Sequence, residues 1–414
     1  MSGSHTHSRA PVASVETRRR LLVAIAPFAV ATVIGFIVLW PSGESPDVGV
    51  GPVVQYDGTV RDVEPQDCAG GLPGGENFVC SRVAALVEEG PDAGEEVTFE
   101  TAEGLGVRKL QVGDKIRLGE SPDAPPELRY YFADYQRETP LLWLGLMFAV
   151  VVVALSRWRG LAALVGLGLS LLVLLQFVIP AILQGSHPLA VAIVGAAAIM
   201  FVTLYLAHGL TARTSTAVLG TLISLGLTGA LAVLFVEATK FSGLASEEAT
   251  FLQVSAGQVN LEGLILGGII IGTLGVLDDV TITQASAVWE LHIANPAYSV
   301  RELYRSAVRI GRDHIASTVN TLVLAYAGAS LPLLIVFSLS ARPLGDLLTA
   351  EIIAEEIVRT LVGSIGLVAS VPITTFLTAV VVSRDAPHRE HAPRRPRADD
   401  SDFRRPKAED EWRA

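Results

Sequence analysis

Eight apolar runs of roughly 20 residues each divide this chain, and they constrain its fold more than any other feature. A bilayer has a hydrocarbon core about 30 Å thick, which a helix rising 1.5 Å per residue crosses with about 20 residues. We therefore predict an all-α polytopic bundle of about eight membrane-spanning helices. The mean hydropathy of +0.46 is high for a soluble protein and agrees with contact to the lipid bilayer. The predicted spans are Leu21–Trp40, Pro140–Leu155, Leu161–Ile179, Leu189–Ala207, Ala217–Val236, Leu261–Leu277, Ile315–Phe337 and Leu361–Val382.

Arginine residues between these runs predict which side each loop faces, because basic residues near span ends mark the cytoplasmic side. They fall in alternate loops, which predicts a multi-pass protein of the cell membrane with both termini in the cytoplasm. The short second run is retained as a span, since without it every later loop would change sides. The basic positions are Arg18, Arg19, Arg20, Arg157, Arg159, Arg213, Arg301, Arg305, Arg309, Arg312 and Arg384.

The first apolar run has two interpretations. Arginines followed by an apolar stretch are also typical of a cleavable signal peptide. However, Leu21–Trp40 is longer than an ordinary signal core, and Pro41–Pro46 offers no clear small-x-small cleavage site. We therefore predict a membrane anchor at residues 21–40, behind a cytoplasmic tail at residues 1–20.

Residues 41–139 change character to short β-favouring runs separated by Gly, Pro and Asp. We predict a small all-β domain of the OB-like barrel type on the outer side of the membrane, preceding a seven-helix domain at residues 140–382. The β domain holds 20 acidic and 8 basic residues, so it alone is more negative than the whole chain at −11. This acidity argues against nucleic acid as a partner. The predicted strands are Val53–Val63, Phe78–Val87, Glu96–Thr101 and Val112–Leu118.

Cys68 and Cys80 are the only cysteines of the chain, and both lie in this β domain. In an oxidising compartment such a pair closes a disulfide worth roughly 2–3 kcal/mol. A redox or metal site is less favoured, because there is no Cys-x-x-Cys spacing and no nearby His. The proline-rich stretch Glu120–Glu127 then predicts an extended linker. The aromatic residues after it, predicted to lie in the membrane interface, are Tyr130, Tyr131 and Tyr135.

Small residues concentrate in the sixth run, where they allow neighbouring helices to approach closely. They are Gly263, Gly267, Gly268, Gly272 and Gly275. The run ends in Asp278 and Asp279, two carboxylates that a helix C-terminus disfavours. One interpretation is that a new helix begins here with Asp279 as its N-cap. The other is that the carboxylates face the bundle interior and bind a cation or relay a proton.

Asn320 lies inside the seventh run, where an unpaired amide is costly. We predict that it bonds another helix, and we group it with Asp278 and Asp279 as a candidate ion or proton site. The four arginines from Arg301 to Arg312 share one helical face that meets lipid phosphate or these aspartates. An exposed charge ladder before the last run is predicted from Glu351, Glu355 and Arg359.

Catalytic and nucleotide-binding motifs are missing from the sequence: there is no Walker A, no His-Glu-x-x-His and no nucleophile elbow. We expect no enzymatic activity, no metal and no cofactor, and ATP-driven transport would require a partner subunit. Residues 383–414 mix Arg, Asp and Pro without apolar periodicity, which predicts a disordered cytoplasmic tail.

Several motifs together closely resemble the YibE/F family of bacterial multi-pass membrane proteins. They are the glycine-rich run through Asp-Asp-Val-Thr-Ile-Thr-Gln at 263–284, Gly-Arg-Asp-His-Ile at 311–315, Asn-Thr-Leu-Val-Leu-Ala-Tyr-Ala-Gly at 320–328, Gly-Ser-Ile-Gly-Leu at 363–367 and Val-Pro-Ile-Thr-Thr at 371–375. The resemblance covers about residues 53–382. It implies no settled biochemical activity.

A fainter likeness concerns the order of elements. An apolar helix ending in aspartate, an amphipathic segment and then Asn-Thr-Leu resemble the arrangement in SecD/SecF and RND permeases, where proton flow moves an outer domain. The resemblance implies a proton-coupling role for Asp278, Asp279 and Asn320, although this chain has about two more predicted spans.

We therefore expect a permease-like protein of unknown substrate that is coupled to ions or protons. The alternative is a non-transporting scaffold or sensor whose outer domain binds an envelope protein. The direction of Asp278 separates the two expectations: a side chain in the bundle beside Asn320 favours transport, and one that points to water leaves only a helix cap.

Overall fold

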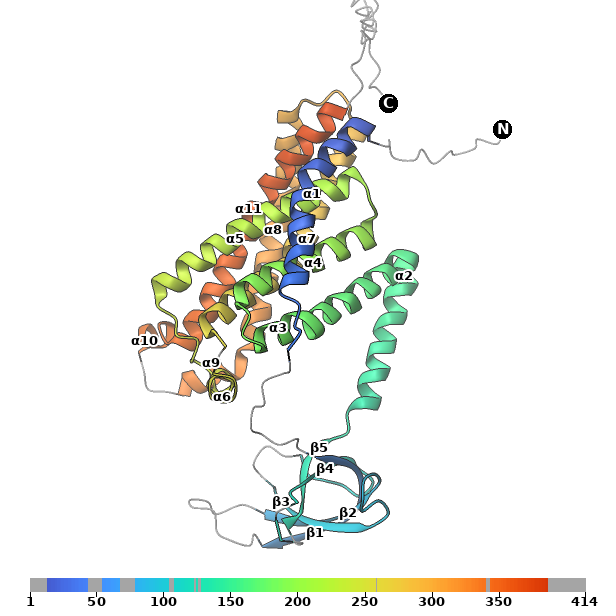
Figure 1. Cartoon of the computed structure of the whole chain (residues 1–414), viewed down its shortest axis with the longest axis vertical. Coiled ribbons are helices and arrows are strands. Elements are labelled where there is room, and N and C mark those ends of the chain that lie inside the picture. Colours follow the sequence, from blue (N-terminus) through green and yellow to red (C-terminus); the bar gives the residue numbers. More distant parts are fainter. Residues whose placement is uncertain are drawn as a thin grey trace, which may run out of the picture.

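The computed structural model describes residues 13–43, 54–67, 79–103, 108–122, 124–125, 128–257, 259–339 and 343–385. They form a helical bundle and a small antiparallel sheet (Figure 1). The helices are α1 Val15–Val38, α2 Glu138–Val173, the π-helical turn η2 Leu174–Val178, α3 Ile179–Leu183, α4 Pro188–His208, α5 Ala212–Thr239, α6 Glu247–Ser255, α7 Leu261–Ala294, α8 Val300–Ala329, α9 Leu331–Leu339, α10 Leu344–Leu348 and α11 Glu351–Asp385. The strands are β1 Gln55–Asp67, β2 Val79–Val87, β3 Glu96–Glu103, β4 Lys115–Glu120 and β5 Tyr130–Tyr135.

Six helical stretches among the described residues are long and apolar enough to cross a membrane, and the pair α8 and α9, bent by 63°, makes a seventh if counted as one span. The predicted membrane bundle is confirmed in this form, but the predicted count of eight is not. The difference lies in Glu138–Leu183, which is one stretch of 46 residues where we predicted two spans. Inside it Arg157 has a positive φ of 54°, which breaks the helix, and Figure 1 shows two legs meeting at an angle.

The two described ends of the bundle lie together. The backbone N–H of Ser14 donates to Oδ1 of Asp385 at 2.8 Å. A buried cluster joins the starts of α1 and α5 to the ends of α7 and α11, and a second cluster adds the start of α8. At the opposite end, Trp40 stacks on Phe177, and the sheet lies on that side of the bundle (Figure 1). The first cluster comprises Ala13, Leu21, Ala212, Trp289 and Val382, and the second Val288, Leu303, Ala307 and Ala379.

The centre of the bundle is formed by α5, α7 and α11, which contact one another along much of their length. They approach closely because threonines on one helix lie over glycines on the next. A Cβ added to Gly366 would lie 2.0 Å from Oγ1 of Thr228, and one added to Gly220 would lie 2.2 Å from Oγ1 of Thr374. Glycine is therefore required at these two contacts.

The sheet has the strand order β3-β2-β1-β4-β5, with every pair antiparallel. Its side chains enclose one apolar core that includes Val60, Val83, Phe99 and Ile116. The four predicted strands are present, and the prediction missed the fifth. The predicted linker is instead the β4–β5 connection, closed by Ser121 N–H to the Arg129 carbonyl at 2.8 Å.

The tyrosines that we predicted to be interfacial anchors belong to β5, and two of them, Tyr130 and Tyr135, pack in the sheet instead, while Tyr131 is exposed. Tyr130 is buried in the core of the sheet, and its hydroxyl bonds Asp92. The hydroxyl of Tyr135 donates to the Arg108 carbonyl at 2.5 Å. Phe132 and Tyr135 of the same strand pack against this core as well.

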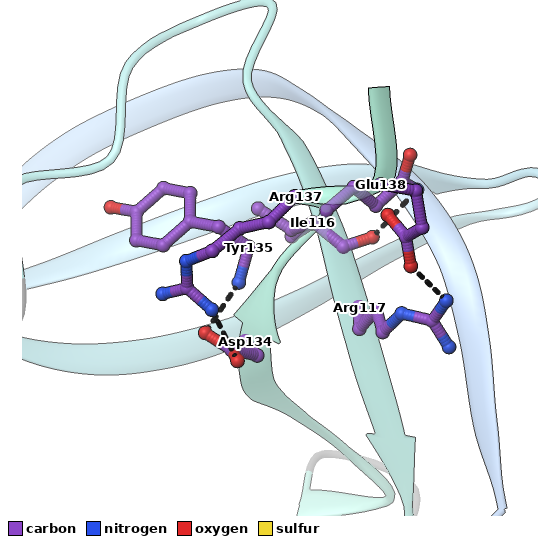
Figure 2. A network of polar contacts seen from close by, with 7 residues as sticks. Ile116, Arg117, Asp134, Tyr135, Arg137 and Glu138 are labelled. Carbon is purple, nitrogen blue, oxygen red and sulfur yellow. Dashed lines mark hydrogen bonds and ion pairs between the residues drawn. The ribbon is translucent and has the colours of Figure 1, made fainter. Parts of the chain in front are cut away.

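The sheet continues into the bundle with two residues between β5 and α2, and a polar network braces this junction (Figure 2). Arg117 of β4 pairs with Glu138 in the first turn of α2. The side chain of Gln136 donates to the Ile116 carbonyl at 3.1 Å, and Arg137 pairs with Asp134 at 2.5 Å. Two strands of the sheet are therefore fastened to the start of the helix.

Several predictions fall partly outside the described residues. Cys80 is buried in β2, but Cys68 is not among the described residues, so the disulfide stays a prediction. The same holds for residues 1–12 and 386–414 of the two predicted tails. The helix α1 begins at Val15, before the predicted span at Leu21, and α11 ends at Asp385, after the predicted span end at Val382.

Candidate functional site

Asp278 and Asp279 lie in the middle of α7, which runs unbroken over 34 residues. Our interpretation of Asp279 as the N-cap of a new helix was wrong. The N-cap of this helix is Asn260, whose side chain accepts from the N–H of Gly263 at 2.7 Å. The helix continues past the aspartates because Val280, Ala285 and the apolar residues after them remain buried against neighbouring helices.

The carboxylate of Asp278 points to the interior of the bundle. Its Oδ2 accepts a hydrogen bond of 3.3 Å from the hydroxyl of Thr203 on α4. Its Oδ1 is buried and has no hydrogen-bond partner among the described residues. A buried acceptor without a partner is costly, so this oxygen is available to a proton, a water molecule or a cation.

Two further threonines flank this carboxylate. Thr221 of α5 and Thr281 of α7, both fully buried, share a hydrogen bond of 2.7 Å. The Thr281 hydroxyl also lies 3.2 Å from the backbone carbonyl of Asp278. Three helices therefore supply hydroxyl groups around one carboxyl group.

A cavity of about 400 Å³ opens on one side of Asp278, between α2, α4 and α7. Most of its lining is apolar, including Leu167, Leu204 and Leu274. Its polar lining residues are Ser170, Thr203, His208, Asp278 and Asp279. The cavity reaches His208, the last residue of α4, so it connects the carboxylates with the end of the bundle where the described termini lie.

Asp279 differs from Asp278 in its surroundings. It lines the same cavity, but it is exposed and makes no hydrogen bond or ion pair with the described residues. Successive residues of a helix point about 100° apart, which places one carboxylate inside the bundle and the other at the cavity opening.

The family model for YibE/F-like proteins matches residues 144–384. The chain belongs to this family. The predicted resemblance is therefore confirmed, and the match extends from the first leg of α2 to the end of α11. No curated protein and no solved structure matches the chain.

The site of this YibE/F-like chain lies wholly inside the matched region, whereas α1 and the sheet lie outside it. The third predicted residue, Asn320, is not brought to the site. It is exposed on α8 and does not line the cavity. The buried residues of α8 are Leu303, Ala307 and Gly311, all of which precede the seventh run, so the Asn320 amide faces outward where we expected an interhelical bond.

The glycines of α7 have different surroundings in the YibE/F-like bundle. Gly263 and Gly267 face α4, where an added Cβ would lie 3.1 Å from Pro188 and 3.2 Å from Ala192. Gly268 and Gly272 face the side chains of Arg359 and Tyr326. Gly275 has no atom within 4 Å of an added Cβ and lines the cavity.

The charged residues at the start of α11 do not pair with one another as the predicted ladder requires. Glu351 accepts hydrogen bonds from the N–H groups of Ser242 and Gly243, at 2.5 and 2.9 Å, and so fastens the end of α5 to the start of α11. Arg359 pairs with Glu356 at 2.6 Å instead of with Glu355. Side-chain spacing alone predicted the wrong partner because both glutamates lie within reach of the guanidinium group.

Sequence reasoning missed the threonines around Asp278. Thr281 follows Asp278 by three residues, a spacing that places both on one helical face. This signal was hidden by the assumption that the helix ends at the aspartates. Thr203 and Thr221 lie on other helices, and no local pattern connects them with Asp278.

Proposed function

We propose that this YibE/F-like protein is a membrane transporter coupled to protons, and that Asp278 is the group that binds and releases the proton. The observation that carries the proposal is a carboxylate in the middle of a membrane-length helix, beside a cavity, with one oxygen unpartnered. An ionised carboxylate is costly in such surroundings, so binding of one proton or cation offsets the cost.

The arrangement of the ends supports eight spans with both termini in the cytoplasm. Since Ser14 and Asp385 are hydrogen bonded, the number of crossings is even. The six single stretches plus the α8–α9 pair make seven, and the break at Arg157 divides one stretch into two, which makes eight. Four of the five segments that carry the arginines gather at the end where the termini lie, namely the starts of α1, α5 and α8 and the end of α11. This is the cytoplasmic end by the positive-inside rule.

The sheet at the opposite end is then extracytoplasmic. Its two edge strands, β3 and β5, contact one another, so the sheet curls toward a barrel, which supports the OB-like assignment. The acidic surface and the braced junction with α2 suit a domain that holds a substrate or an envelope partner next to the bundle.

Proton flux in liposomes tests the proposal. The purified full chain is reconstituted with an internal pH-sensitive dye, a pH gradient is imposed, and valinomycin with potassium balances the charge. We expect flux from the parent protein and its loss in Asp278→Asn. Asp279→Asn is the matched control. It also removes one negative charge, but from the exposed carboxylate of the next residue.

Equal flux in all three proteins and in empty liposomes would refute proton coupling. That result would favour the rival function of a non-transporting scaffold or sensor, for which the braced junction between the sheet and α2 is the supporting observation. Loss of flux in Asp279→Asn alone would place the proton site at the cavity opening and refute the assignment to Asp278.

A further inference from the structure

The surface of α8 that points away from the bundle carries mostly small and polar side chains. Exposed residues recur there three and four positions apart, so they share one face of the helix. Leu324 is the one large apolar residue among them. We call this surface the α8 outer face, defined as Ala316, Ser317, Asn320, Thr321, Leu324 and Gly328.

Other membrane-length helices of the same chain expose a different kind of surface. The exposed side chains of α2 include Trp143, Phe148 and Val151, and those of α1 include Phe28 and Ile34. Large apolar side chains of this kind are what a helix presents to hydrocarbon. Small and polar residues are instead typical of a surface that another helix covers, because they allow the backbones to approach closely and hydrogen bond.

Asn320 places an amide on the α8 outer face at the depth of the bundle centre. The preceding residue, Val319, packs inward against a cluster that includes Val280 of α7, two residues from Asp278, and Leu367 of α11. The Asn320 side chain is exposed and makes no hydrogen bond with the described residues. An amide without hydrogen bonds is costly in hydrocarbon, so lipid alone is an unfavourable neighbour for this face.

The chemistry of this face is complementary to itself. An asparagine side chain carries both an N–H donor and a carbonyl acceptor, so two amides related by a twofold axis satisfy one another. Two copies of one membrane protein have the same orientation in the bilayer, so their α8 helices run parallel and residues of equal number meet at the axis.

Charges at the cytoplasmic start of the face agree with this parallel pairing. Arg309 and Asp313 are exposed, lie one helical turn apart, and make no ion pair with the described residues. In a parallel pair, Asp313 of each copy therefore lies within a turn of Arg309 of the other, and opposite charges meet on both sides of the axis. At the other end, a Cβ added to Gly328 has no atom within 4 Å, so contacts within the described chain do not require glycine there.

We propose that the protein forms a twofold dimer in the membrane through the α8 outer faces, with the two Asn320 amides hydrogen bonded across the axis. The second copy covers the polar side chains, and Gly328 allows the two helices to approach closely. The proposal is independent of proton coupling, because the Asp278 site lies on the contacts of α7 with α4 and α5.

Energy transfer between labelled copies tests the dimer. Full-length protein is labelled on its N-terminal amine with a donor or an acceptor dye, and the two samples are mixed in liposomes over a range of protein-to-lipid ratios. Asn320→Leu removes the amide, Asn320→Gln retains it, and Gly328→Val fills the space needed by the second helix. Gly168→Val is the matched control, since Gly168 is an exposed glycine of α2 whose added Cβ also has no atom within 4 Å.

We expect the parent to associate with a transfer efficiency that rises linearly with the acceptor fraction, as a dimer requires. Asn320→Leu and Gly328→Val should each raise the dissociation constant about tenfold or more, equivalent to about 1.4 kcal/mol. Asn320→Gln and Gly168→Val should associate like the parent. The unfolding temperature in detergent should stay parental in Asn320→Leu, because the side chain is exposed in the single chain.

A parent that stays monomeric in liposomes of pure lipid would overturn the proposal, and would point to lipid or a different protein on this face. Parental dissociation constants in both Asn320→Leu and Gly328→Val would also overturn it, because the copies would then meet elsewhere. A curved dependence on the acceptor fraction would indicate a larger assembly and exclude the twofold pair. None of these outcomes would change the result of the proton-flux experiment with Asp278→Asn.

Discussion

The contact between Gly366 and Thr228 gives the sharpest test of the bundle. A Cβ at position 366 would lie 2.0 Å from Oγ1 and 3.2 Å from Cβ of Thr228. Threonine is stiff about χ1, and its hydroxyl already donates to the Ser224 carbonyl at 2.9 Å, so it has no easy way to move. Overpacking of this kind costs about 1–3 kcal/mol, and loss of the hydrogen bond adds about 1 kcal/mol.

We therefore expect Gly366→Ala to be destabilised in detergent, measured as a lower unfolding temperature from tryptophan fluorescence. Gly226→Ala is the control, since an added Cβ there has no atom within 4 Å. That change removes backbone entropy from the unfolded chain and stabilises by roughly 0.5–1 kcal/mol. The two variants should differ by roughly 2.5–5 kcal/mol, and Thr228→Ala combined with Gly366→Ala should recover most of the loss. Equal unfolding temperatures for both single variants would refute the close approach of α5 and α11.

Three other predictions concern the rest of the chain. Gln284→Leu should destabilise the bundle by roughly 1–3 kcal/mol in the same assay, because the buried amide of α7 donates to the Ala307 carbonyl of α8 at 2.8 Å and to the Thr375 hydroxyl of α11 at 2.7 Å. An unchanged unfolding temperature would contradict this contact between the three helices. The Arg137 side chain and the Tyr135 N–H hold the pKa of Asp134 below its ordinary value of 3.8. Ionised Asp134 should therefore stabilise the junction above about pH 4, with loss as the pH falls through the lowered pKa, and Asp134→Asn should flatten this part of a stability titration. Non-reduced peptide mapping should find Cys68 linked to Cys80, and two free thiols would contradict the disulfide.

The number of long apolar helices and the side that each loop faces were largely predictable, because both depend on how each segment interacts with lipid and water. Apolar length and loop arginines depend on each segment's contact with membrane and water, not on which helix is its neighbour. They located every helix that forms the bundle core. They did not show that two predicted spans adjoin at Arg157 with no loop between them, since a single positive φ replaces the connection.

The errors arose where tertiary contacts decide. Tyr130 precedes a membrane span, as interfacial aromatics do, but it pairs in register with Glu120 and completes the core of the sheet. Asn320 lies in an apolar run, yet its position on the helix circumference turns it outward. Neither outcome follows from neighbouring residues, because both depend on which surface another element covers.

The two aspartates show how one tertiary fact changes the meaning of a local pattern. If the helix ended at Asp278 and Asp279, the sequence would not tell which side chain faces the bundle, and either residue could serve as a cap. Once the helix is known to continue, Leu274 and Thr281, four residues before and three after Asp278, are both buried, and they share its face. The corresponding neighbours of Asp279 include Gly275, which is exposed. Two identical charges about 1.5 Å apart along one axis therefore differ only in direction. For this reason a difference between Asp278→Asn and Asp279→Asn reports on the buried site and not on charge in general.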